Sequence, residues 1–169
     1  MAVAEEAHQF EHRDLHWGNV LVKETTLKTV EFTLGGDTYQ VETGGVLTTI
    51  IDFSLSRLTM DEATIFNNLA EDPSLFTAKG LPGGDYQFDI YRKIQELNKN
   101  TWEPFKPRSN MLWLDYMLDK MDKEVYYSTK KTAKNNKSGL GKIRALRKTL
   151  DNFACAADWV RREGNRMDE

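Results

Sequence analysis

The chain has 169 residues, 40% of them hydrophobic and 29% charged, and a formal net charge of −3. This length and composition favour a single globular domain, and no apolar run approaches the roughly 18 residues that a membrane-spanning helix needs. One cysteine, Cys155, excludes an internal disulfide and suits a reducing compartment. We therefore expect a soluble intracellular domain without membrane contact, whose bulk charge points to no particular partner.

The first distinctive motif follows a short helix predicted over residues 2–10. Residues 11–19 read E-H-R-D-L-H-W-G-N, which contains the pattern H-R-D-x-x-x-x-N of protein-kinase catalytic loops. Phosphoryl transfer needs a carboxylate that accepts the proton of the substrate hydroxyl, and oxygen ligands that hold Mg²⁺ on the phosphates of ATP. The pattern therefore predicts Asp14 as the catalytic base and Asn19 as a ligand of Mg²⁺.

A second metal ligand is predicted after a β-rich stretch. Residues 20–22 read as a short buried strand, and the alternating run 29–41, interrupted by two glycines, predicts a hairpin. Residues 46–53 then form the second strand of the site and deliver Asp52 within I-I-D-F-S, where kinases place a metal-binding Asp. Because the hairpin separates Asp52 from the catalytic loop, strand pairing has to bring the two together. Ser54 replaces the glycine that usually ends this motif, and we expect it to restrict the backbone.

The segment 58–85 is acidic and is interpreted as the activation and substrate segment. Between positions 61 and 89 there are six acids and one base. An acidic surface beside a phosphoryl-transfer site would concentrate a basic peptide substrate; alternatively, these are solvated loop charges, as such runs usually are. The segment has no A-P-E triplet, which argues against control by phosphorylation of this loop.

Three helices are predicted in the remainder of the chain. The first covers residues 85–97 and carries Asp89 in D-I-Y, which resembles the D-x-W of the central kinase helix, whose Asp holds the backbone of the catalytic loop. Alternatively, Asp89 only complements the helix dipole. Ser109 is expected to cap the second helix, and the third extends from Ile143 to Val160 with its apolar face in the core.

A basic stretch lies between the last two of these helices. Residues 127–141 are rich in Lys, Asn, Ser and Gly and predict a flexible linker. Eight bases and no acid lie between positions 125 and 150. Such lysines can bind nucleic acid or act as a nuclear signal, but we favour a solvated linker, so no direct nucleic-acid binding is expected.

The other polar residues of the catalytic loop are assigned supporting roles. His12 is expected to pack beneath the loop, and Arg13 to pair with a nearby acid, since no A-P-E triplet anchors a phosphorylated segment for it to bind. His16 stands where kinases usually carry a phosphate-contacting Lys. It could contact the γ-phosphate of ATP, although a neutral imidazole is a weaker partner than a cation.

Four stretches together resemble the haspin family of atypical serine/threonine protein kinases: H-R-D-L-H-W-G-N-V-L-V, I-I-D-F-S-L-S-R-L, L-F-T and G-D-Y-Q-F-D-I-Y-R. The resemblance implies an α+β, mainly α fold, the C-terminal lobe of a kinase with a small β-hairpin element and no N-terminal lobe. It divides residues 1–169 into the catalytic loop with its metal-binding strand (10–57), the activation and substrate segment (58–85) and a helical subdomain (86–169).

The same resemblance implies a kinase that uses ATP and Mg²⁺ to phosphorylate a threonine near the N-terminus of the histone H3 tail, in the nucleus during mitosis. The basic tail would bind in an acidic groove, for which Glu71, Asp72 and Asp85 are the matching acids. Pro73 and Ser74 interrupt the acidic run that is typical of the family. The chain is expected to be a monomer.

The parts with which kinases position ATP are not found in the sequence. It contains no glycine-rich loop, no strand lysine of the V-A-I-K type and no helix glutamate to pair with that lysine. We therefore expect a fragment with little or no kinase activity of its own. Two other classes stay open: a small-molecule phosphotransferase of the aminoglycoside or choline kinase type, and a non-catalytic module that binds basic peptides.

Overall fold

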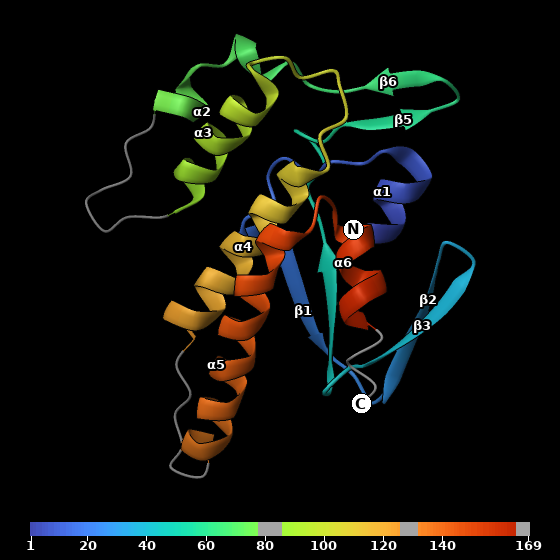
Figure 1. The fold of residues 1–169 in the computed structure, drawn as a ribbon, viewed down its shortest axis with the longest axis vertical. Helices are drawn as coiled ribbons and strands as arrows, with labels where there is room; N and C mark the ends of the chain where they lie inside the picture. The colour runs from blue at the N-terminus through green and yellow to red at the C-terminus, as the bar shows by residue number, and fades with distance from the viewer. Residues whose placement is uncertain (78–85, 126–131, 165–169) are drawn as a thin grey trace.

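The protein combines helices with small antiparallel sheets in a computed structural model that describes residues 1–77, 86–125 and 132–164 (Figure 1). The helices of these residues are α1 (Ala2–His8), α2 (Ser74–Thr77), α3 (Gln87–Asn98), α4 (Arg108–Lys123), α5 (Thr132–Thr149) and α6 (Ala156–Glu163). Single 3₁₀ turns lie at Trp17–Asn19, Leu69–Glu71 and Leu150–Asn152. The strands are β1 (Val20–Glu24), β2 (Thr29–Leu34), β3 (Asp37–Glu42), β4 (Val46–Ile50), β5 (Leu58–Met60) and β6 (Ala63–Ile65).

The β1–β4 pair positions the candidate site. β1 runs antiparallel to β4 with Val20 opposite Ile50, so the segment with Asp52 returns beside the catalytic loop as the sequence predicts. β4 ends at Ile50 and not at residue 53, because Asp52 has a φ of +60° that a strand cannot adopt. The prediction that residues 20–22 are buried is wrong, since β1 is exposed along most of its length.

The predicted hairpin is formed by β2 and β3, which pair in register with Phe32 opposite Tyr39. Their rings stack with centroids 5.4 Å apart. Gly35 and Gly36 form the two-residue turn with φ values of +62° and +87°, a conformation that favours glycine. Leu34 joins this hairpin to a core cluster shared with α1 and α6 (Figure 1).

A second hairpin, β5–β6, was not predicted from the sequence. Its strands have three residues each and project from the body of the molecule (Figure 1). Asp61 and Glu62 form its turn, both with positive φ. Neither residue predicts a turn with positive φ as glycine would. The strands are also too short to show a clear alternating pattern.

The largest core cluster lies where α3 and α4 meet the catalytic loop. Its fully buried members are Leu15, Leu69, Ile90, Tyr91, Ile94, Trp102, Trp113 and Tyr116. The inner face of α4 carries Trp113 and Tyr116 together with the buried polar residues Ser109 and Asn110. Ser109 does not cap this helix; it lies within α4 and donates to Glu11. Polar side chains that bond to the catalytic loop therefore occupy positions that an apolar pattern would assign to the surface.

The C-terminal part departs from the predicted linker and single helix. Residues 132–141 belong to α5, and residues 127–131 of the predicted linker lie outside the described residues. α5 lies beside α4 (Figure 1), where Arg147 pairs with Asp115 at 2.6 Å. The predicted helix ends before Phe153, because Arg108 binds the carbonyls of Leu150 and Phe153 and the backbone becomes extended.

After this break, Cys155 caps α6. Its Sγ accepts a hydrogen bond from the Asp158 amide at 3.4 Å. Burial raises the pKa of the Cys155 thiol, so it stays protonated and unreactive. Among the described helices, none is long and apolar enough to cross a membrane.

Candidate active site

The catalytic loop, residues 11–19, rests on a buried carboxylate. Glu11 is fully buried and accepts hydrogen bonds from the Lys106 amide at 2.7 Å and from Ser109 Oγ at 2.7 Å. It also pairs with the equally buried Arg13 at 3.2 Å. Arg13 donates in turn to the Trp102 carbonyl and lies over the Trp102 ring. Arg13 therefore pairs with a local acid, as its structural interpretation predicts.

The backbone of the loop is anchored to α4 by the side chain of Asn110. Its Oδ1 accepts from the His12 amide at 3.0 Å, and its Nδ2 donates to the Phe10 carbonyl at 2.8 Å and to Glu5 Oε1 at 2.7 Å. Glu5 is buried, and burial raises the pKa of its carboxyl, although the bonds from Asn110 and from the Ala157 amide partly offset this effect. The anchor is therefore a chain of hydrogen bonds from the loop to α1, α4 and α6.

The prediction that Asp89 holds the loop is corrected by this arrangement. The Asp89 side chain is 54% exposed and pairs with Arg92 one turn further along α3. It lies on the outer face of α3, whereas Ile90, Tyr91 and Ile94 face the core. Its position in the first turn is that of an acid complementing the helix dipole, which was the alternative interpretation.

His12 connects the loop with the segment that carries Asp52. It is buried; its Nε2 bonds with the Ile51 carbonyl at 3.2 Å, and its Nδ1 accepts from the Asp14 amide at 3.3 Å. Burial lowers the pKa of His12, which keeps the ring neutral. With Nδ1 as an acceptor, Nε2 carries the proton and donates. His12 thus takes the packed, structural position expected of it.

Asp14 is the innermost carboxylate of the candidate site, with a side chain only 13% exposed. Its Oδ1 accepts from the Tyr91 hydroxyl, and its Oδ2 lies 3.4 Å from Asn19 Nδ2. Burial raises its pKa, and the hydrogen bond from Tyr91 and the charges of His16 and His12 act in the opposite direction. His16 Nε2 lies 3.9 Å from Asp14 Oδ1, so His16 reaches the same space.

Asp52, unlike the mostly buried Asp14, has an exposed carboxylate. Its Oδ1 accepts from both the amide and the hydroxyl of Ser54, at 3.2 and 2.7 Å, and these bonds lower its pKa. The Ile51 amide donates to the Asn19 carbonyl at 3.0 Å, which fixes the two candidate metal ligands on adjoining segments. Ser54 thus holds an ionised carboxylate in place through its side chain and its amide.

The donor set suits a magnesium ion better than an all-protein metal centre. Among the residues described, no group of three or more His, Cys, Asp and Glu side chains could hold a metal. Mg²⁺ in phosphoryl transfer typically takes one or two protein ligands together with substrate phosphates and water. The amide of Asn19 and the ionised carboxylate of Asp52 fit that requirement.

The predicted substrate acids lie on the surface and make local contacts. Glu71 accepts from Asn68 Nδ2 at 2.9 Å, and Asp72 Oδ1 accepts from the amide of Ser74 at 3.1 Å. Both side chains remain exposed. Asp85, the third predicted acid, lies outside the described residues.

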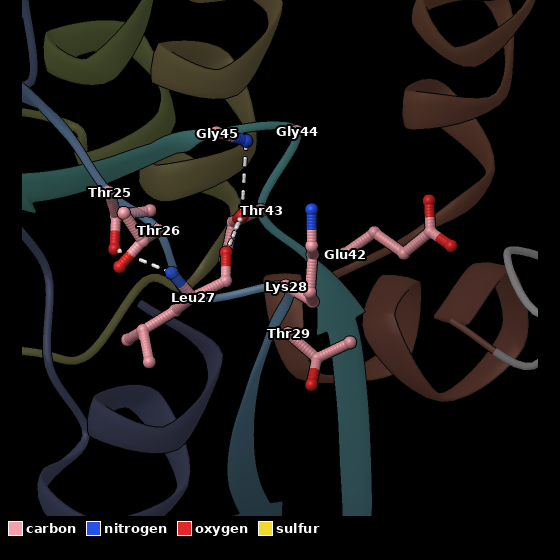
Figure 2. A pocket seen from close by; sticks show the side chains of 9 residues that line it. All are labelled: Thr25, Thr26, Leu27, Lys28, Thr29, Glu42, Thr43, Gly44 and Gly45. Atoms are coloured by element: carbon pink, nitrogen blue, oxygen red, sulfur yellow. Dashed lines mark hydrogen bonds between the residues drawn. The ribbon is translucent and has the colours of Figure 1, made fainter.

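A hollow of about 410 Å³ lies elsewhere, between residues 25–29 and 42–45 (Figure 2). Thr43 Oγ1 donates to the Leu27 carbonyl at 2.6 Å and accepts from the Gly45 amide at 3.1 Å. These hydrogen bonds hold the β1–β2 connection against the β3–β4 connection. Five strand residues at about 3.3 Å each separate the hollow from Asn19, a span of about 17 Å. The hollow is therefore not part of the candidate site.

The sequence missed the residues that support the site. Glu5 and Asn110 contact the loop region from positions about a hundred residues apart in the chain, and no local motif marks them. Tyr91 lies in the helix predicted over residues 85–97, in the same D-I-Y as Asp89, and nothing in that motif marks its hydroxyl as a partner of Asp14.

The arrangement defines a class of protein. An Asp and an Asn on one loop, with a second Asp delivered by the paired strand, is the constellation that kinases use for phosphoryl transfer. The fold, with helices around the loop and a strand pair beside it, presents that constellation at one edge of the core.

Comparison with known proteins identifies the family. The family model of the haspin-like kinase domain matches residues 1–167, and the chain belongs to this family. It is 41% identical over 158 residues to the serine/threonine-protein kinase haspin of Mus musculus, which covers 94% of this chain and 20% of the mouse protein. The haspin homologs of Drosophila melanogaster and Arabidopsis thaliana are each 39% identical over 93% and 95% of the chain, and the matches cover 27% and 25% of those proteins.

The chain thus spans about a fifth to a quarter of the length of these relatives. Membership of a family of serine/threonine kinases favours a protein kinase over a small-molecule phosphotransferase. Both classes use an Asp and an Asn on one loop, so the site geometry alone does not separate them.

Proposed function

We propose that the chain is the C-terminal lobe of a haspin-like kinase domain and carries its phosphoryl-transfer residues. The observation that supports this proposal is the juxtaposition of three side chains across one loop and one strand pair. Asp14 Oδ2 lies 3.4 Å from Asn19 Nδ2, and the Asn19 carbonyl accepts from the amide of Ile51, the residue before Asp52. The shielded carboxylate is suited to proton transfer, and the exposed one to a cation.

In this proposal Asp14 accepts the proton of a serine or threonine hydroxyl as the γ-phosphate of ATP is transferred to it. A carboxylate whose pKa is raised is a better proton acceptor than an ordinary one, provided that it is still ionised at the working pH. Asn19 and Asp52 would hold Mg²⁺, which neutralises charge on the phosphate oxygens when it is bound. His16 is near enough to Asp14 to contact the transferred phosphate.

The substrate that we propose is the basic tail of histone H3, with the chain acting as a monomer in the nucleus on mitotic chromosomes. The exposed acids Asp61, Glu62, Glu71 and Asp72 support a basic substrate, since an acidic surface raises the local concentration of a basic peptide. Glu71 and Asp72 each use one oxygen in a local hydrogen bond, and both carboxylates remain open to solvent.

The test is phosphate transfer from Mg-ATP to a histone H3 tail peptide, followed with radiolabelled ATP. Because little activity is expected of the chain alone, the assay needs prolonged incubation; in any transfer that is detected, Asp14→Asn should reduce the rate by about 10²- to 10⁴-fold, the usual contribution of a general base. Asp37→Asn, an equally small change at the exposed start of β3, should leave the rate unchanged.

Equal rates for the two variants would overturn the role of Asp14. No transfer by the unmodified chain would overturn kinase activity for the chain by itself. Peptide binding that persists without transfer, and that is indifferent to Asp14→Asn and to Mg²⁺, would favour a binding module instead.

A further inference from the structure

The candidate base has a partner that the proposed chemistry does not use. Tyr91, on α3, is 3% exposed, and its hydroxyl donates to Asp14 Oδ1 from 77 residues away in the sequence. Its ring meets Trp113 edge to face with centroids 5.3 Å apart and also contacts Phe88. Packing therefore fixes the ring, and the direction of the hydroxyl follows from it.

The hydrogen bond has a defined direction. Gln87 Nε2, one turn earlier on α3, lies 3.2 Å from the Tyr91 oxygen as a donor. A phenol has a single hydrogen, so Tyr91 accepts from Gln87 and gives its own hydrogen to Asp14. Burial and the hydrogen bond to Asp14 raise the pKa of Tyr91 above its ordinary value, so the hydroxyl is protonated and can donate at neutral pH.

We propose that Tyr91 is a positioning residue for phosphoryl transfer, which holds the Asp14 carboxylate in the orientation that accepts the substrate proton. This inference rests on the proposed function of Asp14. With Tyr91 on Oδ1 and Asn19 on Oδ2, both oxygens have a donor, and rotation of the carboxylate is restricted. Each carboxylate oxygen accepts about two hydrogen bonds, so one place on each oxygen stays open and either can accept from the substrate hydroxyl.

Orientation of this kind affects the rate more than it affects substrate binding. A carboxylate that rotates freely must be reoriented for each reaction, whereas a carboxylate that is held in place starts near the reactive geometry. Loss of the bond should therefore lower kcat and kcat/KM by the same factor, and KM should not change.

The kinetic experiment compares Tyr91→Phe with Tyr86→Phe in transfer from Mg-ATP to the peptide. Both variants lose one hydroxyl and keep the ring, but the Tyr86 hydroxyl donates to Asp115 and not to the site. We expect kcat to fall about tenfold for Tyr91→Phe, with KM values for ATP and peptide unchanged, and no change for Tyr86→Phe. An unchanged or higher kcat for Tyr91→Phe would overturn the proposal, as would equal losses in both variants.

A second measurement does not need activity. In protein labelled with ¹³C at the tyrosine Cζ, the Tyr91 resonance, assigned by its loss in Tyr91→Phe, should shift in Asp14→Ala, while the Tyr86 resonance should not. A Tyr91 resonance that is indifferent to Asp14 would overturn the inference even if the chain is an active kinase. If the resonance shifts but Asp14→Asn does not affect transfer, the proposed function fails and the contact between the two residues stands.

Discussion

The catalytic loop and the acidic segment at residues 58–77 are built in contrasting ways. In the loop, Glu11, His12 and Arg13 are fully buried, and Glu11 and His12 bond to partners about a hundred residues away. In the acidic segment, Glu71 and Asp72 are exposed and bond within three residues of themselves.

Under the proposed function, the difference separates two demands on a phosphotransferase. Groups that move protons and phosphate have to be held near one geometry, and buried polar networks are rigid when every member is bonded. A surface that attracts a substrate by charge needs only its charge and its access to solvent. The geometry of the catalytic loop therefore depends on the rest of the fold, whereas the charge of the acidic segment depends only on its amino-acid composition.

The largest expected effect is a difference in the free energy of unfolding between two glutamate variants, one from each region. Glu11→Ala should lower the free energy of unfolding by about 3–5 kcal/mol, because it leaves the buried Arg13 without its counter-charge. Glu71→Ala, on the surface, should change the free energy by no more than about 0.5 kcal/mol. Urea unfolding followed by circular dichroism measures both values, and similar losses would contradict the comparison.

A smaller, pH-dependent effect is expected for Glu5, which supports the loop through Asn110. Burial raises its pKa in the folded protein. The favourable contribution of Glu5 to the free energy of unfolding is therefore complete below the pKa that Glu5 has in the unfolded chain. This contribution is lost as the pH rises through the pKa that Glu5 has in the folded protein. The stability of Glu5→Gln relative to the unmodified protein should therefore increase as the pH is raised above about 4, the usual pKa of an unfolded glutamate. A stability difference that stays flat over this range, in urea titrations at several pH values, would show that Glu5 is not held as described.

The smallest effect is expected for Asp89. Its exposed pair with Arg92 should contribute less than about 0.5 kcal/mol to folding, so Asp89→Ala should leave both the urea midpoint and phosphate transfer nearly unchanged. A loss of several-fold in transfer would restore Asp89 as the anchor of the loop and would weaken the case for Asn110.

The features that could be predicted from the sequence depend on residues that are close together in the chain. The H-R-D-x-x-x-x-N motif, the glycine turn of β2–β3 and the return of Asp52 beside Asn19 all depend on residues within about thirty positions of one another. These signals are carried by residue types with few other uses, such as paired glycines or a loop Asp followed by Asn.

What the sequence could not predict depends on the inner face of α4. Ser109 and Asn110 are buried because the catalytic loop supplies their hydrogen-bond partners, and a hydrophobic pattern cannot show that. The break after Leu150 was missed for a similar reason, since Arg108 from α4 binds the free carbonyls there. Asp89 was misassigned because a resemblance of three letters does not fix which face of a helix a residue occupies.

The hydrogen bonds of Asn110 have a consequence for biosynthesis. The amide holds His12 and Glu5, and the second oxygen of Glu5 accepts from the amide of Ala157. Contacts between such distant positions form late, because a long loop must close first. On the ribosome, the loop that contains Asp14 emerges before α4 and α6, and its anchor is incomplete until α6 has followed. We expect the site to remain without order until α6 has been synthesised.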